Sequence, residues 1–166
     1  MKSLENYPYK NIPSISSIIT LIKPITWFPP MWAFLCGAVS SSNISFDTSM
    51  LLLIGLILSG PIVCGMSQAI NDWCDKEVDA INEPSRPIPS GKVPGSWGFW
   101  IAVIMSMTGI IVSWFLGFWG FFATLLAIAC AWAYSAEPIR LKRSGIIGPS
   151  IVALCYEGLP LSLIHI

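Results

Sequence analysis

The sequence predicts an all-α membrane protein, a bundle of helices that cross the bilayer several times. Of its 166 residues, 54% are hydrophobic and only 11% are charged, whereas soluble domains carry about 25% charged residues. The mean hydropathy is +0.70, and a soluble chain of this size needs a largely polar surface. Long stretches without any charge, described next, complete the prediction. Together these observations exclude a soluble single-domain enzyme.

Four windows free of Asp, Glu, Lys and Arg follow one another, at residues 24–46, 48–71, 93–136 and 144–156. A membrane-spanning helix needs about 20 mostly apolar residues. The first two windows each hold one span. The third is long enough for two, at 97–114 and 119–134, with a break near Gly117, and the fourth begins another. We therefore expect four complete spans and the start of a fifth, after a polar, partly disordered or interfacial cytoplasmic segment at 1–22.

The basic residues alternate between the segments that join these spans. Lys and Arg number three in the N-terminal segment, none near Asp47, three in 71–96, none near Gly117 and three in 137–144. Loops rich in Lys and Arg stay on the cytoplasmic side of a membrane. The N-terminus and the second and fourth connections are therefore predicted to be cytoplasmic.

The segment 71–79, NDWCDKEVD, places Asp72, Asp75 and Asp79 directly after the second span. On a helix, these three carboxylates lie within roughly 60° of one another and repel strongly where screening is weak. Oxygen ligands without His or Cys favour Mg²⁺, which binds one or two carboxylates plus substrate phosphates. A solvated acidic helix end is the simpler alternative. The segment continues an apolar span, however, and acidic residues at membrane depth are functional candidates.

Basic residues in two neighbouring loops make a diphosphate the expected ligand. Arg86 follows the acidic segment, and Arg140, Lys142 and Arg143 lie in the next cytoplasmic loop. Mg²⁺ bridges diphosphate oxygens while Arg and Lys neutralise the remaining charge. The loop 82–91, NEPSRPIPSG, excludes regular helix through its three prolines and glycine. It is either a stiff support for Arg86 or a simple linker.

Several of these motifs resemble the UbiA superfamily of intramembrane prenyltransferases. NDxxDxxxD at 71–79 is similar to the first aspartate-rich motif of that superfamily. The segments 79–91 (DAINEPSRPIPSG) and 134–143 (YSAEPIRLKR) resemble its chlorophyll synthase branch. Within that branch, TWFPPMW at 26–32, Cys74 and ALCYEGLP at 153–160 look more like the bacteriochlorophyll-forming members than the oxygenic ones. The resemblance extends over residues 21–160.

The resemblance implies a nine-span helical bundle with its active site on the cytoplasmic side, of which residues 23–160 form the N-terminal half. It implies an enzyme that transfers a geranylgeranyl or phytyl group from its diphosphate to the propionate carboxylate of (bacterio)chlorophyllide, in a bacterial inner or intracytoplasmic photosynthetic membrane. By motif position, Asp72, Asp75 and Asp79 are the catalytic residues and hold the Mg²⁺ cofactor. The implied substrate-binding residues are Asn71, Arg86, Tyr134, Lys142 and Arg143. Neither a nucleic acid nor a protein partner is implied.

Two features depart from the family pattern. No Asp follows Asp79, so the second aspartate-rich motif of the family is absent, and we expect the 166-residue chain alone to be inactive. The last six residues, LSLIHI at 161–166, are what CTG TCT CTT ATA CAC ATC encodes, a string that matches a transposase adapter used in library preparation. We interpret them, including the only histidine, His165, as a sequencing artefact. Resequencing the locus tests this hypothesis.

Two other functions stay open on the sequence alone. A UbiA-type enzyme could use a different acceptor, either the chlorophyllide of an oxygenic phototroph or an aromatic ring. A non-catalytic cation-binding or structural membrane protein could bind metal through the same acidic segment. A transporter is disfavoured, because its charges and broken helices belong at the bilayer midplane, whereas the charges here lie at the ends of the spans.

Overall fold

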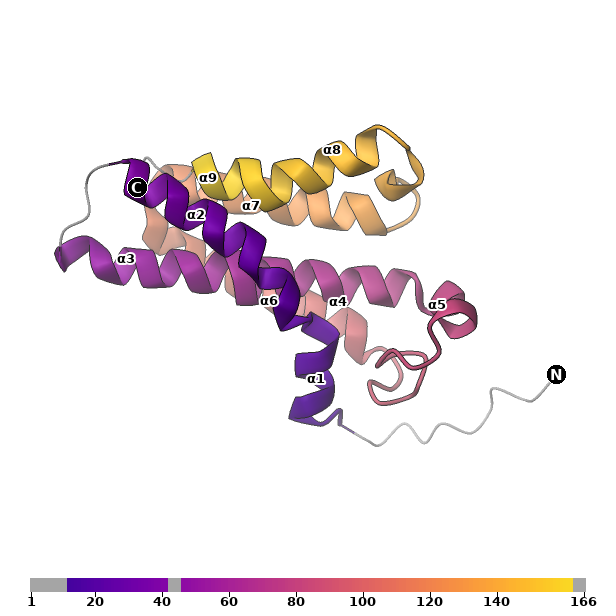
Figure 1. Ribbon diagram of the computed structural model, residues 1–166. Helices are drawn as coiled ribbons and strands as arrows, with labels where there is room; N and C mark the ends of the chain where they lie inside the picture. The colour runs from indigo at the N-terminus through magenta and orange to yellow at the C-terminus, as the bar shows by residue number, and fades with distance from the viewer. Residues whose placement is uncertain (1–11, 42–45, 163–166) are drawn as a thin grey trace.

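The computed structural model describes residues 12–41 and 46–162, and the described chain is helical throughout, apart from turns and loops (Figure 1). The predicted all-α class is confirmed. The α-helices are α1 (Ile15–Ile22), α2 (Phe28–Ser40), α3 (Phe46–Ile57), α4 (Gly65–Cys74), α5 (Lys76–Asn82), α6 (Trp97–Ser113), α7 (Gly117–Ser135), α8 (Ile147–Ala153) and α9 (Leu159–Ser162). Shorter 3₁₀ turns cover Pro24–Trp27, Trp114–Leu116 and Leu141–Arg143, and π-helical turns cover Leu58–Cys64 and Leu154–Gly158.

The chain bends before its first predicted span. Ser14 caps α1 by accepting a hydrogen bond from the backbone N–H of Ser17, and α1 meets the helix of Pro24–Ser40 at 41°. Proline disfavours helical geometry in the residue before it and favours an extended one. Lys23 instead adopts a left-handed conformation with a φ of 45°. The sequence did not predict α1. Its Leu21 is fully buried in the bundle core, so this segment is part of the fold.

The second span is one apolar helical stretch, Ser49–Cys74, in which a π-helical turn joins α3 to α4. Pro61 lies in this turn. The helix departs from regular α geometry here because proline lacks a backbone N–H and its ring clashes with the preceding turn. Small residues let α2 approach closely: a Cβ at Gly60 would lie only 2.5 Å from the Sδ atom of Met31. Such small-residue contacts are typical of helix packing in membranes.

The helical stretch Trp97–Ser135 is also long and apolar enough to span a bilayer, but it reverses direction. Gly117 has a φ of 72°, which glycine adopts readily. The rings of Phe99 and Trp132, near the two ends of the stretch, lie 5.8 Å apart, and Trp132 donates a hydrogen bond to Ser106. The stretch is therefore an antiparallel pair, α6 and α7, with the predicted break at Gly117.

By length and composition alone, two helical stretches in the described residues qualify as spans, or three if the bent pair Ile15–Ile22 and Pro24–Ser40 counts as one. The reversal at Gly117 divides the second stretch into two legs. The start of a further span is the helical run from α8 to α9. Within the C-terminal segment that the sequence analysis set apart, Leu161 and Ser162 continue α9, and 163–166 lie outside the described residues.

The bundle core lies between α4, α6 and α7, with Leu21 of α1 added from the side. The outer face of α6 is apolar: Trp100, Ile104, Met107 and Ile111 are all more than half exposed. An apolar face of this length suits lipid rather than water, as expected for an integral membrane protein. Figure 1 shows α5 and the α7–α8 turn at one end of the bundle. That end carries the candidate site.

Candidate functional site

The acidic segment does not form one straight helix. The helix α4 ends at Cys74, Asp75 has the non-helical angles φ −98° and ψ 4°, and α5 begins at Lys76. The assumed stripe of three carboxylates is therefore split: Asp72 and Asp79 are buried on one side, with 0% and 6% of their surface exposed, whereas Asp75 faces a different set of cations. Each carboxylate contacts cationic partners.

Asp72 and Asp79 share one guanidinium. Arg86 lies 2.8 Å from Asp79 Oδ2 and 3.3 Å from Asp72 Oδ1, and Lys23 Nζ donates to the same Asp72 oxygen at 2.7 Å. Partial burial lowers the pKa of Arg86, but the charges of Asp72 and Asp79 outweigh burial and leave this pKa raised. Three chain segments are thus tied together by charge.

The proline-rich loop that carries Arg86 is held by its own backbone hydrogen bonds. The N–H of Arg86 donates to the carbonyl of Glu83, the N–H of Ser90 donates to the carbonyl of Arg86, and the N–H of Val93 donates to the carbonyl of Pro87, at 2.9–3.0 Å. Val93 is 1% exposed and belongs to the core. The loop is a structured support for Arg86, which favours the stiff-loop interpretation over a simple linker.

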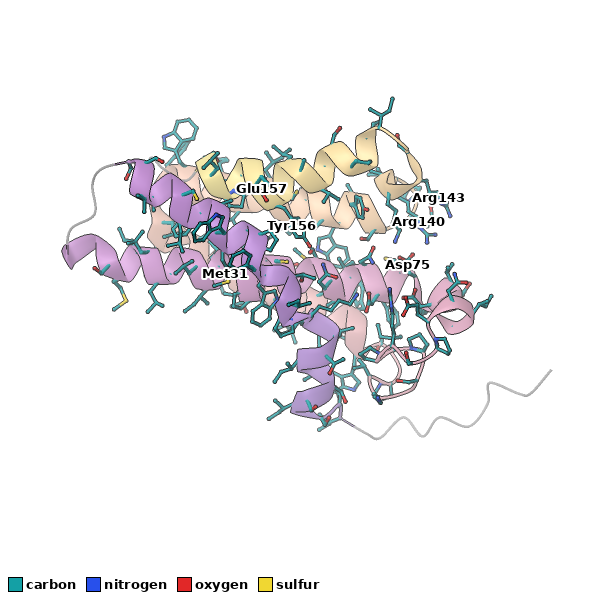
Figure 2. All side chains as sticks on the ribbon, viewed as in Figure 1. Met31, Asp75, Arg140, Arg143, Tyr156 and Glu157 are labelled. Carbon is teal, nitrogen blue, oxygen red and sulfur yellow. The ribbon has the colours of Figure 1, made fainter. Side chains whose placement is uncertain are left out.

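Asp75 contacts the loop between α7 and α8. Arg140 donates to Asp75 Oδ1 at 2.7 Å, Lys142 donates to Oδ2 at 2.6 Å, and Lys142 also donates to Asn71 Oδ1 at 3.0 Å. Figure 2 shows Asp75, at the end of α4, opposite Arg140 of this loop. Hydrogen bonds to Glu137 and Asp75 raise the pKa of Arg140. The structure therefore brings Asn71, Asp75 and Lys142 together, as the motif resemblance implied.

Arg143 lies outside the group formed by Asn71, Asp75, Arg140 and Lys142. Its side chain is 66% exposed and pairs with Glu137 at 2.8 Å, whereas the side chain of Arg140 is only 16% exposed. From the sequence, Arg140 was one of the loop cations but Arg143 was the predicted diphosphate ligand, and Lys23 had no predicted role in the site. The sequence feature that pointed to Lys23 and Arg140 was the presence of basic residues in three segments at this end of the bundle. This feature does not indicate which side chains point inward.

The carboxylate oxygens at this end of the bundle are the kind of ligand that a hard divalent cation binds. Within residues 12–41 and 46–162, no three acidic, histidine or cysteine side chains converge on one point, because Lys and Arg lie between the carboxylates. In the same ranges, two buried polar atoms lack a hydrogen-bond partner, Asp72 Oδ2 and Arg140 Nε. Buried atoms of this kind call for an explanation, such as an ion. An acceptor oxygen on a buried carboxylate is a suitable Mg²⁺ ligand.

Two hollows adjoin the charged cluster, which consists of three carboxylates and four cations: Asp72, Asp75, Asp79, Lys23, Arg86, Arg140 and Lys142. The inner cavity has a volume of about 200 Å³ and lies between α4, α7 and the start of the last helical run. Its polar lining residues are Ser67, Gln68, Asn71, Tyr134, Ser135 and Tyr156. The outer groove, about 680 Å³, shares Tyr134, Val152 and Tyr156 with the inner cavity and also touches Lys142 and Gly148. A ligand can therefore contact the cationic loop and the membrane-level interior together.

A half-buried hydrogen bond joins two residues that line the inner cavity. Gln68 lies one helical turn before Asn71, and its amide donates to the Tyr156 hydroxyl at 2.9 Å; the Cys64 thiol approaches the same hydroxyl at 3.6 Å. Tyr156 lies within the π-helical turn Leu154–Gly158, and such turns are frequent at functional sites; Gln68 lies in α4. Neither residue was predicted from the sequence to belong to a site. The feature that could have indicated one is the amide side chain of Gln68 inside a predicted span.

Replacing Tyr156 with Phe is expected to lower the free energy of unfolding by about 1–2 kcal/mol, because the Gln68 amide loses its partner in a poorly hydrated place. The double variant Gln68→Met/Tyr156→Phe should lose less unfolding free energy than the sum of the losses in the two single variants. Thermal unfolding in detergent, followed by near-ultraviolet circular dichroism, provides the comparison. Strictly additive losses would show that the bond between Gln68 and Tyr156 does not contribute.

Comparisons with known proteins agree with this geometry. A family model described as the UbiA prenyltransferase family matches residues 28–163. The chain is 62% identical over 151 residues to the bacteriochlorophyll synthase 33 kDa chain of Rhodobacter capsulatus, covering 91% of this chain and 50% of that protein. It is 47% identical over 142 residues to the bacteriochlorophyll synthase 34 kDa chain of Chloroflexus aurantiacus, covering 85% and 46%. The chain thus spans about half the length of these curated relatives.

Among solved structures, a UbiA homolog from Archaeoglobus fulgidus bound to GPP and Mg²⁺ superposes with a TM-score of 0.74. The match covers 90% of this chain and 54% of that one, at 19% identity. At this level of identity the similarity concerns the fold. It shows that the helices described above are arranged as in that homolog.

Proposed function

Because the chain belongs to the UbiA prenyltransferase family, we propose that it carries the donor-diphosphate site of an enzyme that esterifies bacteriochlorophyllide with a geranylgeranyl or phytyl group. The observation that carries this proposal is the charged cluster itself. Three carboxylates and four cations form two ion-pair groups at one end of an apolar bundle, beside a cavity lined by α4 and α7. Ionisable side chains at the edge of a membrane bundle are functional candidates, and carboxylates beside Arg and Lys suit a metal-bound diphosphate.

The proposed roles follow from the contacts. Asp72, Asp75 and Asp79 would hold Mg²⁺, which when bound supplies positive charge to the diphosphate oxygens. Arg86 and Lys142 would bind the same diphosphate, which is supported by the contact of each with a carboxylate that would hold the metal. Asn71 orients Lys142 through the hydrogen bond between Asn71 Oδ1 and Lys142 Nζ.

In the proposed reaction, the bond between the allylic carbon of the prenyl group and the diphosphate oxygen breaks, and its electron pair stays on the diphosphate. A carboxylate oxygen of the acceptor forms the new bond to that carbon, which yields an ester and free diphosphate. The acceptor carboxylate is already ionised, so no proton moves and no histidine is needed. Preplaced Arg and Lys side chains stabilise the charge that grows on the leaving group.

The acceptor assignment rests on the relatives, and the hollows are compatible with it. Both reported relatives are bacteriochlorophyll synthases. The outer groove opens to the surface beside Lys142 and joins the inner cavity along Tyr134 and Tyr156. A large flat acceptor could lie in the groove with its carboxylate toward the cluster. We also propose that this charged end faces the cytoplasm of a phototrophic bacterium, following the positive-inside rule.

A direct assay tests the proposal. The full open reading frame that encodes this chain, purified in lipid nanodiscs, is expected to convert bacteriochlorophyllide and geranylgeranyl diphosphate into the esterified pigment when Mg²⁺ is present. Chelation with EDTA should abolish the product, and added Mg²⁺ should restore it, because the carboxylates then recover their cation. Chromatography with mass detection identifies the ester. Parallel reactions contain chlorophyllide or an aromatic acid, and product only in one of those would reassign the acceptor.

A further inference from the structure

Lys23 and Arg140, to which the sequence assigned no binding role of their own, occupy carboxylate oxygens that a metal ion would need. Lys23 Nζ lies 2.7 Å from Asp72 Oδ1, and Arg140 Nη2 lies 2.7 Å from Asp75 Oδ1. Asp72 is completely buried, so its charge depends on the few cations that reach it. Leaving a buried carboxylate without a partner is costly.

A metal ion cannot simply be added to this arrangement. A divalent cation on Asp72 or Asp75 would lie within a few ångströms of the Lys23 or Arg140 charge, and like charges at that distance repel strongly where water is scarce. A diphosphate resolves the conflict, because it brings several negative oxygens that can accept the displaced side chains. Lys23 and Arg140 have long flexible stems and are 26% and 16% exposed, which leaves them room to move.

Two independent observations single out these residues. Lys23 and Arg140 are the non-glycine residues with positive φ, 45° and 39°, in the described parts of the chain. Such strained backbone persists where the surroundings over-determine it and is common at sites that bind or switch. In addition, Asp72 Oδ2 and Arg140 Nε are buried without partners. The cluster therefore contains a free acceptor on one ion pair and a free donor on the other.

We propose that Lys23 and Arg140 are exchange cations: each neutralises its aspartate in the free protein and transfers to a diphosphate oxygen when the metal and the diphosphate bind. This inference rests on the proposed function and goes beyond it by assigning two binding residues and their second state. Lys23 lies at the joint between α1 and the first span. Its transfer would thus couple α1 to the filling of the site.

Binding measurements test the exchange without relying on turnover. The full open reading frame in nanodiscs is titrated with Mn²⁺ alone, followed by electron paramagnetic resonance, and with inorganic diphosphate at saturating Mg²⁺, followed by calorimetry. For Lys23→Met and for Arg140→Met, we expect Mn²⁺ to bind about tenfold tighter and diphosphate about tenfold more weakly, within the usual range of coupling between sites. The two effects have opposite signs because the variant loses both a competitor of the metal and a ligand of the diphosphate.

Control variants separate this role from a structural one. Lys92→Met removes an exposed lysine of the proline-rich loop and should leave both affinities unchanged, whereas Lys23→Arg keeps the charge and should stay near the original protein. Weakening of both ligands in Lys23→Met and Arg140→Met would mean that these residues only support the fold. Tightening of both would mean that they only block the metal. If the unaltered protein binds no diphosphate, the proposed function itself is overturned together with this inference.

Discussion

Asp72→Asn in the full open reading frame is expected to reduce turnover by roughly a hundred- to a thousandfold, the size of effect that follows loss of one preorganised electrostatic group. Asp72 is the most enclosed charge of the cluster, with 0% exposure, and it contacts both Lys23 and Arg86. The amide keeps the size of the side chain but leaves two cations facing a neutral group. Initial rates of ester formation at saturating substrates, together with binding of the pigment measured by its absorbance, check the prediction.

The comparison with pigment binding identifies the cause of the loss. Pigment affinity should change little, because the residues that line the outer groove come from α2, α7, α8, the loop between α7 and α8 and the π-helical turn after α8, and do not include Asp72. Glu83→Gln is the matched control: it removes a carboxylate that is 55% exposed and 3.7 Å from Arg86, and it should keep nearly full activity. Equal loss of turnover and pigment binding in Asp72→Asn would point to misfolding instead of a catalytic defect.

Arg86→Met is expected to be the most destabilising single substitution at this end of the bundle. Arg86 bridges Asp72 and Asp79, which are 0% and 6% exposed. Without it, Asp79 keeps a buried charge and loses its guanidinium partner, which costs on the order of 3 kcal/mol. We expect thermal unfolding in detergent to occur at a clearly lower temperature and the purified variant to lack activity.

Two further variants make this result specific. The unfolding temperature of Arg86→Lys should lie between those of the original protein and Arg86→Met, because a single ammonium cannot span both carboxylates as a planar guanidinium does. Lys92→Met, an exposed position in the same loop, should unfold like the original protein. An Arg86→Met variant that unfolds at the original temperature would show that the ion pairs of Asp72 and Asp79 contribute nothing to stability.

Much of the fold could be predicted because hydrophobicity and charge act locally. The charge-free windows located the apolar helical stretches, since each must exceed the thickness of the bilayer. The break at Gly117 could be predicted because the apolar stretch around it is about twice the length of one span. Helix α1 was missed because its eight residues are short and amphipathic, and nothing local indicates that Leu21 enters the core. Pro24 predicts that a helix ends near Lys23, but the left-handed conformation of Lys23 could not be predicted from the local sequence.

The candidate site was predicted in part for the same reason. The aspartate spacing and the motif resemblance located Asn71, Asp72, Asp75, Asp79, Arg86 and Lys142, and the structure places these six residues in two groups at the same end of the bundle. The choice between Arg140 and Arg143 could not be made, because three residues of spacing do not tell which side chain turns inward. The backbone of Arg140, with its φ of 39°, directs this side chain to Asp75.

The sequence by itself determined the membrane-embedded helical class, the approximate spans, the family and the acidic and basic segments, because these depend on composition and on the order of neighbouring residues. Only the tertiary structure decided which charges meet. Lys23 reaches Asp72 across 49 positions of sequence and Arg140 reaches Asp75 across 65. Such pairings arise when apolar helices pack and carry their loops to the same end of the bundle, where a poorly hydrated setting makes every buried charge find a partner.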